Sequence, residues 1–161
     1  MPIEHRDLVT IERRLQELLN ARGCEEMAEV LKASDTEAPD VWVDGERWGN
    51  RRVARGEYQT VFGRVGLERS VYQRKGRGRV AIPMDLRLGI VECSYTPRMA
   101  SILCLATAFM TDEEAARLLA EVGTAAISKS TIHRVPRSIA ARYETRRKSI
   151  ERSIRDPRPD S

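Results

Sequence analysis

The sequence predicts an α+β fold, with an N-terminal amphipathic helix, a small antiparallel sheet and a C-terminal helical region. Three observations support this prediction: apolar residues recur every three or four positions near the N-terminus, alternate in the middle of the chain, and return to helical spacing after residue 94. We divide the chain into an N-terminal helical segment (1–38), a small β-sheet region (39–92), a helical region (93–152) and a disordered tail (153–161).

The first helix is predicted from the spacing of its apolar positions, which are Leu8, Ile11, Leu15, Leu18 and Leu19. Gly23 is expected to end or kink this helix, and a shorter helix is expected to continue over 27–31. The helix is expected to pack on its own domain. Self-association through it, giving a homo-oligomer, is the alternative. A polar connector containing Pro39 follows over 34–40.

Residues 41–82 predict an antiparallel sheet of about three strands. Val41 and Val43 alternate with Trp42, and Asp44-Gly45 is a turn signal. Two further strand patterns lie within 57–74 and are separated near Gly63. A glycine-interrupted basic loop follows at 75–79, and the segment 80–83 closes the region.

The alternation in the later strand predicts which of its side chains are buried. One face carries Val65, Leu67 and Val71, and the other carries Glu68, Ser70 and Tyr72. We expect the apolar face, with Phe62 nearby, to pack against a helix at 97–110.

The helical region contains several boundary signals. Thr96-Pro97 predicts the start of a mostly buried helix. Thr111 and Glu114 form a capping-box pattern that opens a second helix, which is expected to end before Gly123. Ser128 can cap a short third helix, which Pro136 is expected to stop or kink. A last basic helix is expected to follow Pro136.

Charge is unevenly distributed along the chain. The 28 Lys and Arg against 24 Asp and Glu give a net charge of +4. The net charge is −5 over 1–40, +6 over 41–80, −3 over 81–122 and +6 over 123–161. Two basic blocks of this kind are typical of a nucleic-acid partner, although solvated surface produces similar blocks.

Several classes of protein are disfavoured by the sequence. The longest apolar stretch, 99–110, is shorter than the roughly 20 residues of a membrane helix, and the charged N-terminus shows no secretory signal. Cys24, Cys93 and Cys104 have no CxxC spacing, which favours reduced thiols in a cytoplasmic protein. Neither a metal site nor a cofactor is expected.

Residues 111–135 have the plan of a helix-turn-helix, in which the start of the second helix enters the major groove of DNA. The candidate DNA contacts at that start are Lys129, Ser130, Thr131, His133 and Arg134. Ile127, Ile132 and Val135 would attach the helix to the core. A helical hairpin with no role in DNA binding is the alternative.

The basic loop is a second candidate nucleic-acid site. Its cations are Arg74, Lys75, Arg77 and Arg79. They could bind phosphate groups, or they could form a solvated hairpin loop.

The stretch from Thr60 to Val135 resembles the N-terminal part of bacterial insertion-sequence transposases of the ISKra and ISLre kind, which belong to the DDE class. The resemblance lies in TVFGRVGLERSVYQRKGRG, IPMDLRLGIVECSYTPRM and TDEEAARLLAEVGTAAISKSTIHRV, in that order. The matching positions are Thr60, Gly63, Arg69, Tyr72, Pro83, Asp85, Leu88, Gly89, Ser128, Ser130, Thr131 and Arg134. Met84 replaces the usual Leu, and Pro136 departs from the pattern.

The resemblance implies a DNA-binding segment that contacts double-stranded transposon ends. It also implies a ribonuclease-H-like catalytic domain with three carboxylates, for which the sequence after Val135 shows no strand pattern. We therefore interpret the chain as a non-enzymatic portion, truncated before the catalytic domain and without catalytic residues. Asp85 is expected to cap a turn at 83–86.

Two other functions remain open. A small helix-turn-helix transcriptional regulator would bind an operator as a dimer, with half-sites about one helical turn apart. An RNA-associated or structural module would use the basic loop at 74–79 with little preference for DNA sequence.

Overall fold

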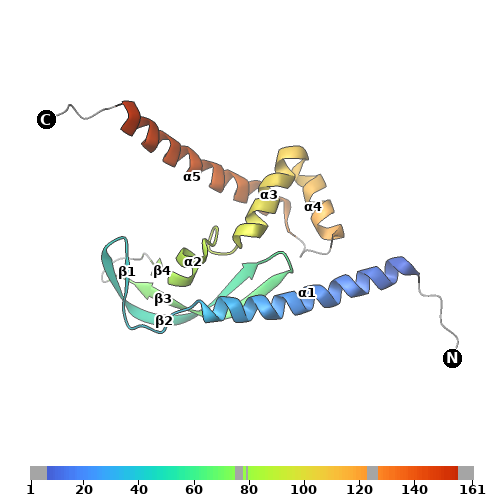
Figure 1. The fold of residues 1–161 in the computed structure, drawn as a ribbon, viewed down its shortest axis with the longest axis horizontal. Helices are drawn as coiled ribbons and strands as arrows, with labels where there is room; N and C mark the ends of the chain where they lie inside the picture. The colour runs from blue at the N-terminus through green and yellow to red at the C-terminus, as the bar shows by residue number, and fades with distance from the viewer. Residues whose placement is uncertain (1–6, 75–77, 79, 123–126, 156–161) are drawn as a thin grey trace.

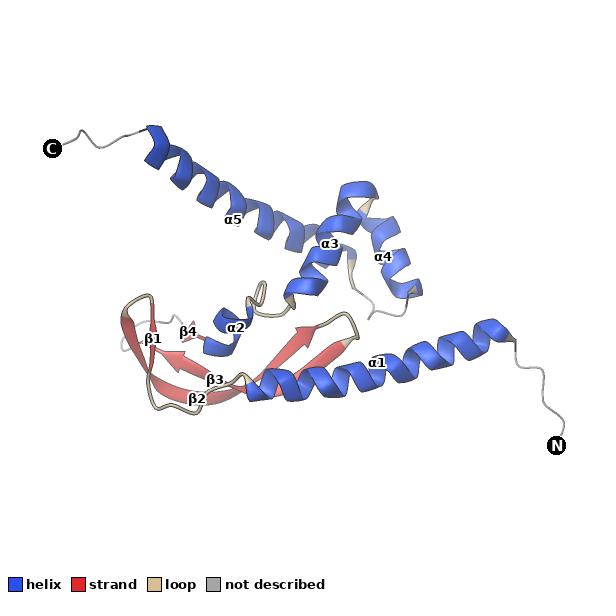
Figure 2. Ribbon diagram, in the orientation of Figure 1, coloured by secondary structure: helices blue, strands red, loops and turns tan. Residues whose placement is uncertain are grey.

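The computed structural model describes residues 7–74, 78, 80–122 and 127–155 (Figure 1). The elements in chain order are α1 (Leu8–Ala33), β1 (Val41–Val43), β2 (Glu46–Gln59), β3 (Arg64–Gln73), β4 (Val80–Ala81), α2 (Pro83–Leu88), α3 (Pro97–Phe109), α4 (Asp112–Glu121) and α5 (Lys129–Arg155). The strands form one antiparallel sheet in the order β1-β2-β3-β4 (Figure 2). The predicted α+β class is confirmed.

The sheet is built around a long hairpin of β2 and β3. The predicted turn at Asp44-Gly45 is confirmed: both residues have positive φ (52° and 76°), as a two-residue type I′ turn requires. Strand β2 starts at Glu46, well before the predicted strand pattern at residue 57. The pairing register of β2 and β3 shifts between Gly49 and Arg52, which breaks the alternation that would have revealed this strand.

Both faces of β3 are covered near its C-terminal end. The predicted apolar face is confirmed at Val65 and Val71, which are buried, whereas Ser70 and Tyr72 on the opposite face are buried too. The alternation therefore assigns the two faces correctly but does not show that the second face is also covered. The connector after α1 covers them: the Ser70 amide donates to Asp35 Oδ2 at 2.8 Å, and the Tyr72 hydroxyl donates to the Ala38 carbonyl at 2.5 Å.

The apolar face of the sheet packs against α1 and α2. Its buried cluster consists of Leu31, Tyr58, Val65, Met84 and Ile90, with Leu67 and Met27 packed against it. The expected partner, the helix at 97–110, belongs to a different cluster, so that prediction is wrong. The periodicity of a strand shows which face is buried but not which helix covers it.

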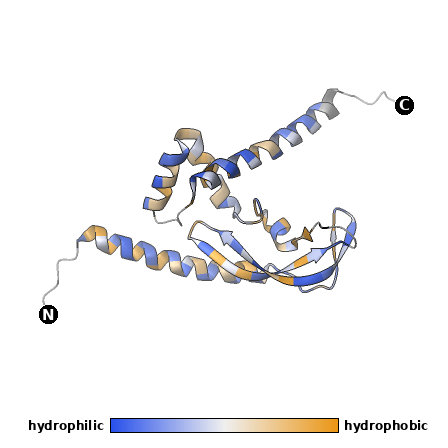
Figure 3. Ribbon diagram, turned by 180° about the vertical axis from the view of Figure 1, so that it is seen from behind, coloured by the Kyte–Doolittle hydropathy of each residue, from blue (hydrophilic) through white to orange (hydrophobic). Residues whose placement is uncertain are grey.

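Helix α1 is continuous through Gly23, so the predicted break is wrong. Gly23 instead allows a close contact: a Cβ atom built there would lie 2.4 Å from ring atoms of Phe62. Hydrophobic positions continue along α1 towards its N-terminal end (Figure 3).

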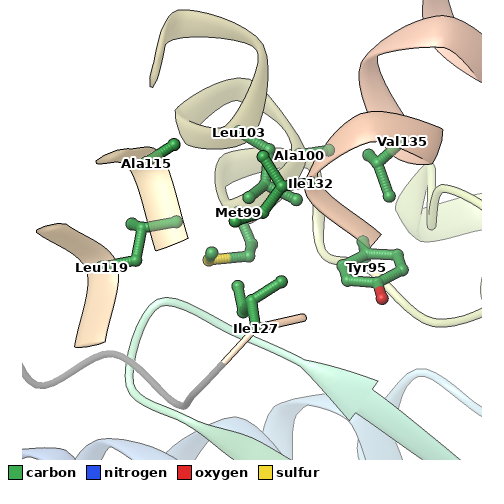
Figure 4. Packing of buried hydrophobic residues seen from close by; sticks show 9 residues of the cluster. All are labelled: Tyr95, Met99, Ala100, Leu103, Ala115, Leu119, Ile127, Ile132 and Val135. Carbon is green, nitrogen blue, oxygen red and sulfur yellow. The ribbon is translucent and has the colours of Figure 1, made fainter. Parts of the chain in front are cut away.

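The second cluster joins α3, α4 and α5 into a helical unit. Its buried residues are Tyr95, Met99, Ala100, Leu103, Ala115, Leu119, Ile127, Ile132 and Val135 (Figure 4). Helix α3 begins at Pro97 as predicted, but it is not mostly buried, because Leu105 and Phe109 are 62% and 81% exposed.

Helix α5 continues through Pro136 to Arg155, so the predicted stop at Pro136 is wrong. Proline removes one backbone donor from a helix. The helix persists because Val135 and Ile139, on either side of Pro136, pack in the helical unit. Residues 153–155, assigned to the tail from sequence, are helical, and 156–161 lie outside the described residues.

The sheet and the helical unit meet at Gln59. Its amide donates to the Ser94 carbonyl at 2.6 Å, and the Thr96 amide donates to the Gln59 carbonyl at 3.1 Å. Gln59 and Tyr95 thus form a short parallel bridge between the end of β2 and the segment before α3.

Candidate nucleic-acid interface

The start of α5 is capped and packed as the sequence predicted. The Ser128 hydroxyl accepts a hydrogen bond from the Thr131 amide at 3.4 Å, and Ile127, Ile132 and Val135 are buried. The capping box at the start of α4 is also confirmed, with Thr111 and Glu114 bonding to each other's backbone amides.

The cations at the start of α5 are each held by a carboxylate. Lys129 Nζ lies 3.0 Å from Glu113 Oε2, and His133 Nδ1 lies 3.1 Å from Asp112 Oδ2. The hydrogen bond from Lys129 lowers the pKa of the Glu113 carboxyl. These pairs reduce the positive potential that this end of the helix can offer to a phosphate group.

Arg134 is paired outside the two helices. Its Nε lies 3.0 Å from Oε2 of Glu92, in the segment that precedes α3. Its side chain is 62% exposed, so water reaches the pair from one side. Lys129 and Arg134 are therefore in ion pairs, and His133 contacts a carboxylate through its ring nitrogen.

The first turns of α4 and α5 lie next to each other, as the Lys129–Glu113 and His133–Asp112 pairs show. A compact helix-turn-helix joins its helices by three or four residues. Here residues 122–128 connect α4 and α5, and 123–126 lie outside the described residues. The acidic first turn of α4 therefore borders the predicted DNA-contacting end of α5.

The predicted hydroxyl contacts differ in accessibility. Ser130 is exposed, whereas Thr131 is half-buried. The Ser128 hydroxyl lies 3.0 Å from the hydroxyl of each, so the three side chains form one small cluster at the helix start. Ser128 and Ser130 are the exposed members of this cluster, and of the two Ser130 is a predicted contact.

Only one cation of the predicted basic loop can be placed. Arg74 forms an ion pair with Glu46 of β2 and is half-buried. Lys75, Arg77 and Arg79 lie outside the described residues.

The middle of α5 presents cations that the sequence analysis did not single out. Arg142 and Arg146 are exposed, and no carboxylate pairs with either among the described residues. Helical spacing places Ala141, Thr145 and Ser149 in a row beside the row of Arg142 and Arg146, and the five residues line one shallow surface. We call these five residues the arginine face of α5.

The acids of α5 lie away from this face. The helix contains nine Lys and Arg and two Glu, for a net charge of +7. Both glutamates are bound by one residue: Arg147 donates to Glu144 at 2.8 Å and to Glu151 at 2.5 Å. Among the described residues, Arg142 and Arg146 are therefore left without a carboxylate partner. The i, i+4 spacing of these arginines in the sequence indicates that they share one helix face. Because a break was expected at Pro136, they were not assigned to the same helix as the candidate site.

Asp85 does not cap a turn, contrary to prediction. It lies in α2, where its carboxylate accepts hydrogen bonds from the Tyr58 hydroxyl at 2.6 Å and from Arg69 Nη1 at 3.0 Å. Tyr58 is fully buried and Asp85 nearly so. This cluster is inaccessible to a substrate, and it connects β2, β3 and α2.

Among the described residues, no three His, Cys, Asp or Glu side chains are placed to hold a metal ion. Within the same residues, no helix has both the length and the apolar character needed to cross a membrane.

Comparison of the chain with protein-family models, curated proteins and solved structures found no match. The resemblance to insertion-sequence transposases therefore depends on the sequence motifs alone.

Proposed function

We propose that the chain binds double-stranded DNA through α5, as the DNA-binding portion of a protein similar to insertion-sequence transposases. The observation that carries the proposal is the arginine face, on which Arg142 and Arg146 are exposed and uncompensated. Cations without protein partners can replace the counterions that DNA phosphates otherwise hold.

The spacing of the two arginines fits a phosphate backbone. Residues four apart rise by about 6 Å along a helix. That rise corresponds to roughly two nucleotide steps of 3.4 Å on one DNA strand. The row of small side chains beside them, which includes Ala141 and Ser149, allows the backbone to approach closely, and Thr145 adds a hydroxyl group.

The start of α5 is the proposed second point of contact. Ser130 is free to reach a base edge or a phosphate oxygen. Lys129, His133 and Arg134 would contact DNA by exchanging their carboxylate partners for phosphate groups. Since these ion pairs are exposed, breaking them has a low cost in free energy.

The proposed role of this part of the chain is recognition of DNA in the cytoplasm, without cleavage or joining of strands. Transposon ends are the target that the sequence resemblance implies. No substrate chemistry is assigned to any residue described here.

The proposal can be tested by fluorescence anisotropy with a labelled random-sequence duplex across a salt series. Arg142→Ala/Arg146→Ala should weaken binding and lower the slope of log affinity against log salt by about 2, since each lost phosphate contact contributes about 0.9. The matched control is Arg52→Ala/Arg55→Ala, which removes the same charge from exposed positions of β2.

The control should leave the salt slope close to that of the wild type. Equal losses in both double variants would show that overall charge, and not the arginine face, determines binding. Unchanged binding in the α5 variant would overturn the proposal. Tighter binding of single-stranded RNA than of duplex DNA would favour an RNA-associated module instead.

A further inference from the structure

Helix α1 changes its apolar face halfway along its length. At 100° per residue, the seam formed by Leu8, Ile11, Leu15, Leu18 and Leu19 occupies an arc of about 100° on one side of the helix. In the second half, Met27, Ala28 and Leu31 pack on the sheet. The centres of these two arcs differ by roughly 180°, so one continuous helix directs them to opposite sides.

The seam is uncovered in the described structure. Its residues are between 40% and 66% exposed, although all five are Leu or Ile. The first half of α1 extends beyond the end of the β2–β3 hairpin (Figure 1). Because the second half is fixed against the sheet, the helix cannot rotate to bury the seam in its own domain.

We propose that the seam pairs with the same seam of a second copy of this chain, giving a dimer through α1. Leu8, Ile11, Leu15 and Leu18 alternate spacings of three and four, which is the pattern that lets two helices interlock side chains. Leu19 widens the contact on one side. An identical helix offers the complementary pattern.

Charge allows this pairing. Residues 7–22 contain three acids and three arginines, so two copies meet without net repulsion. The same neutrality gives the segment no attraction for nucleic acid. In contrast, α5 has a net charge of +7 and would repel its own copy.

The area of the seam predicts a reversible dimer. With on the order of 100 Å² for a fully exposed Leu or Ile side chain and exposed fractions of 40% to 66%, the five residues of the seam offer roughly 300 Å² of apolar surface per copy. Because apolar atoms form about 60% of an interface, the two copies together bury roughly 1,000 Å². That total lies at the lower end for specific interfaces and is typical of partners that dissociate on dilution.

The test is sedimentation equilibrium of the full chain across a micromolar concentration series. The wild type should change from the 18.3 kDa monomer towards twice that mass as concentration rises. Leu15→Glu should remain monomeric at every concentration. The matched control is Gln16→Glu, which adds the same charge beside the seam and should dimerise as the wild type does.

Circular dichroism distinguishes lost pairing from lost folding, because Leu15 is exposed in the monomer and its replacement should preserve the thermal unfolding of the sheet. A wild type that stays monomeric throughout the series would overturn the proposal. A dimer that survives Leu15→Glu would also overturn it, since the interface would then lie elsewhere. Neither outcome depends on DNA binding, so the two proposals can fail separately.

Discussion

Arg69 and Asp85 form an ion pair inside the molecule, with Arg69 Nη1 3.0 Å from Asp85 Oδ2 and side-chain exposures of only 12% and 7%. Gly56 leaves space for this arginine, because a Cβ atom there would lie 2.7 Å from Arg69 Nε. The Tyr58 hydroxyl donates to the same carboxylate. The pair thus connects the hairpin to α2.

Asp85→Asn should destabilise the fold by an amount that depends on pH, because burial and the partners of Asp85 shift its pKa in opposite directions. Burial raises the pKa of the Asp85 carboxyl, and the neighbouring Tyr58 and Arg69 oppose part of that rise. A folded-state pKa above the unfolded value means that this group stabilises the fold at acid pH and that the contribution is lost as pH rises through the folded pKa. The loss of stability in Asp85→Asn should therefore be larger at about pH 4 than at pH 7.

Urea unfolding at the two pH values measures this difference, with the exposed substitution Glu17→Gln as the control. A larger loss at pH 7 would contradict the expectation and would show that the Arg69 charge outweighs burial.

Gly23→Ala should stabilise the protein only when Phe62 is absent. Alanine in a helix interior is favoured over glycine by about 1 kcal/mol. In the wild type, the added Cβ would meet the Phe62 ring at 2.4 Å, so the ring must move and its packing is lost. In a Phe62→Ala background, the gain of about 1 kcal/mol should appear in full. Denaturant unfolding of the wild type, the two single variants and the double variant gives the coupling free energy between Gly23 and Phe62. An equal effect of Gly23→Ala with and without Phe62 would refute the prediction.

Tyr72→Phe should lower the free energy of unfolding by about 0.5–1.5 kcal/mol, because the half-buried Ala38 carbonyl loses its donor. The 34–40 connector should then exchange its amide hydrogens faster. Tyr143→Phe, at a residue 67% exposed, is the control and should have almost no effect. Equal effects of the two substitutions would mean that the connector is not held by this hydrogen bond.

Glu113→Gln should tighten DNA binding several-fold if the start of α5 contacts phosphate. The substitution releases the Lys129 ammonium, which Glu113 holds at 3.0 Å. Fluorescence anisotropy should also show a steeper salt dependence. Glu121→Gln removes the same charge at the exposed end of α4 and serves as the control. The same tightening in both variants would point to overall charge alone.

Local signals in the sequence predicted much of the fold correctly. The Asp44-Gly45 turn, the Thr96-Pro97 start and the Thr111 capping box are confirmed because each depends on residues adjacent in the chain. The breaks expected at Gly23 and Pro136 are wrong because Phe62 and Ile139 act through tertiary contacts that no local pattern contains. Burial of Tyr72 was missed for the same reason, since it depends on a connector 34 residues away.

The candidate site was predicted only in part. The caps and buried residues at the start of α5 were correct, but the carboxylates facing its cations come from Asp112, Glu113 and Glu92. Their approach depends on how the helices pack, which charge counting along the chain cannot show. The arginine face was missed because its residues follow Pro136, where the sequence predicted a break.

The bridge at Gln59 has a mechanical consequence. If α5 holds a large ligand, tension along that helix reaches the sheet through the segment before α3, where Gln59 makes two backbone hydrogen bonds. The β2–β3 hairpin lies beyond these two bonds and is held by a longer ladder of its own. Under tension, the helical unit would separate from the sheet at this junction while the hairpin kept its register.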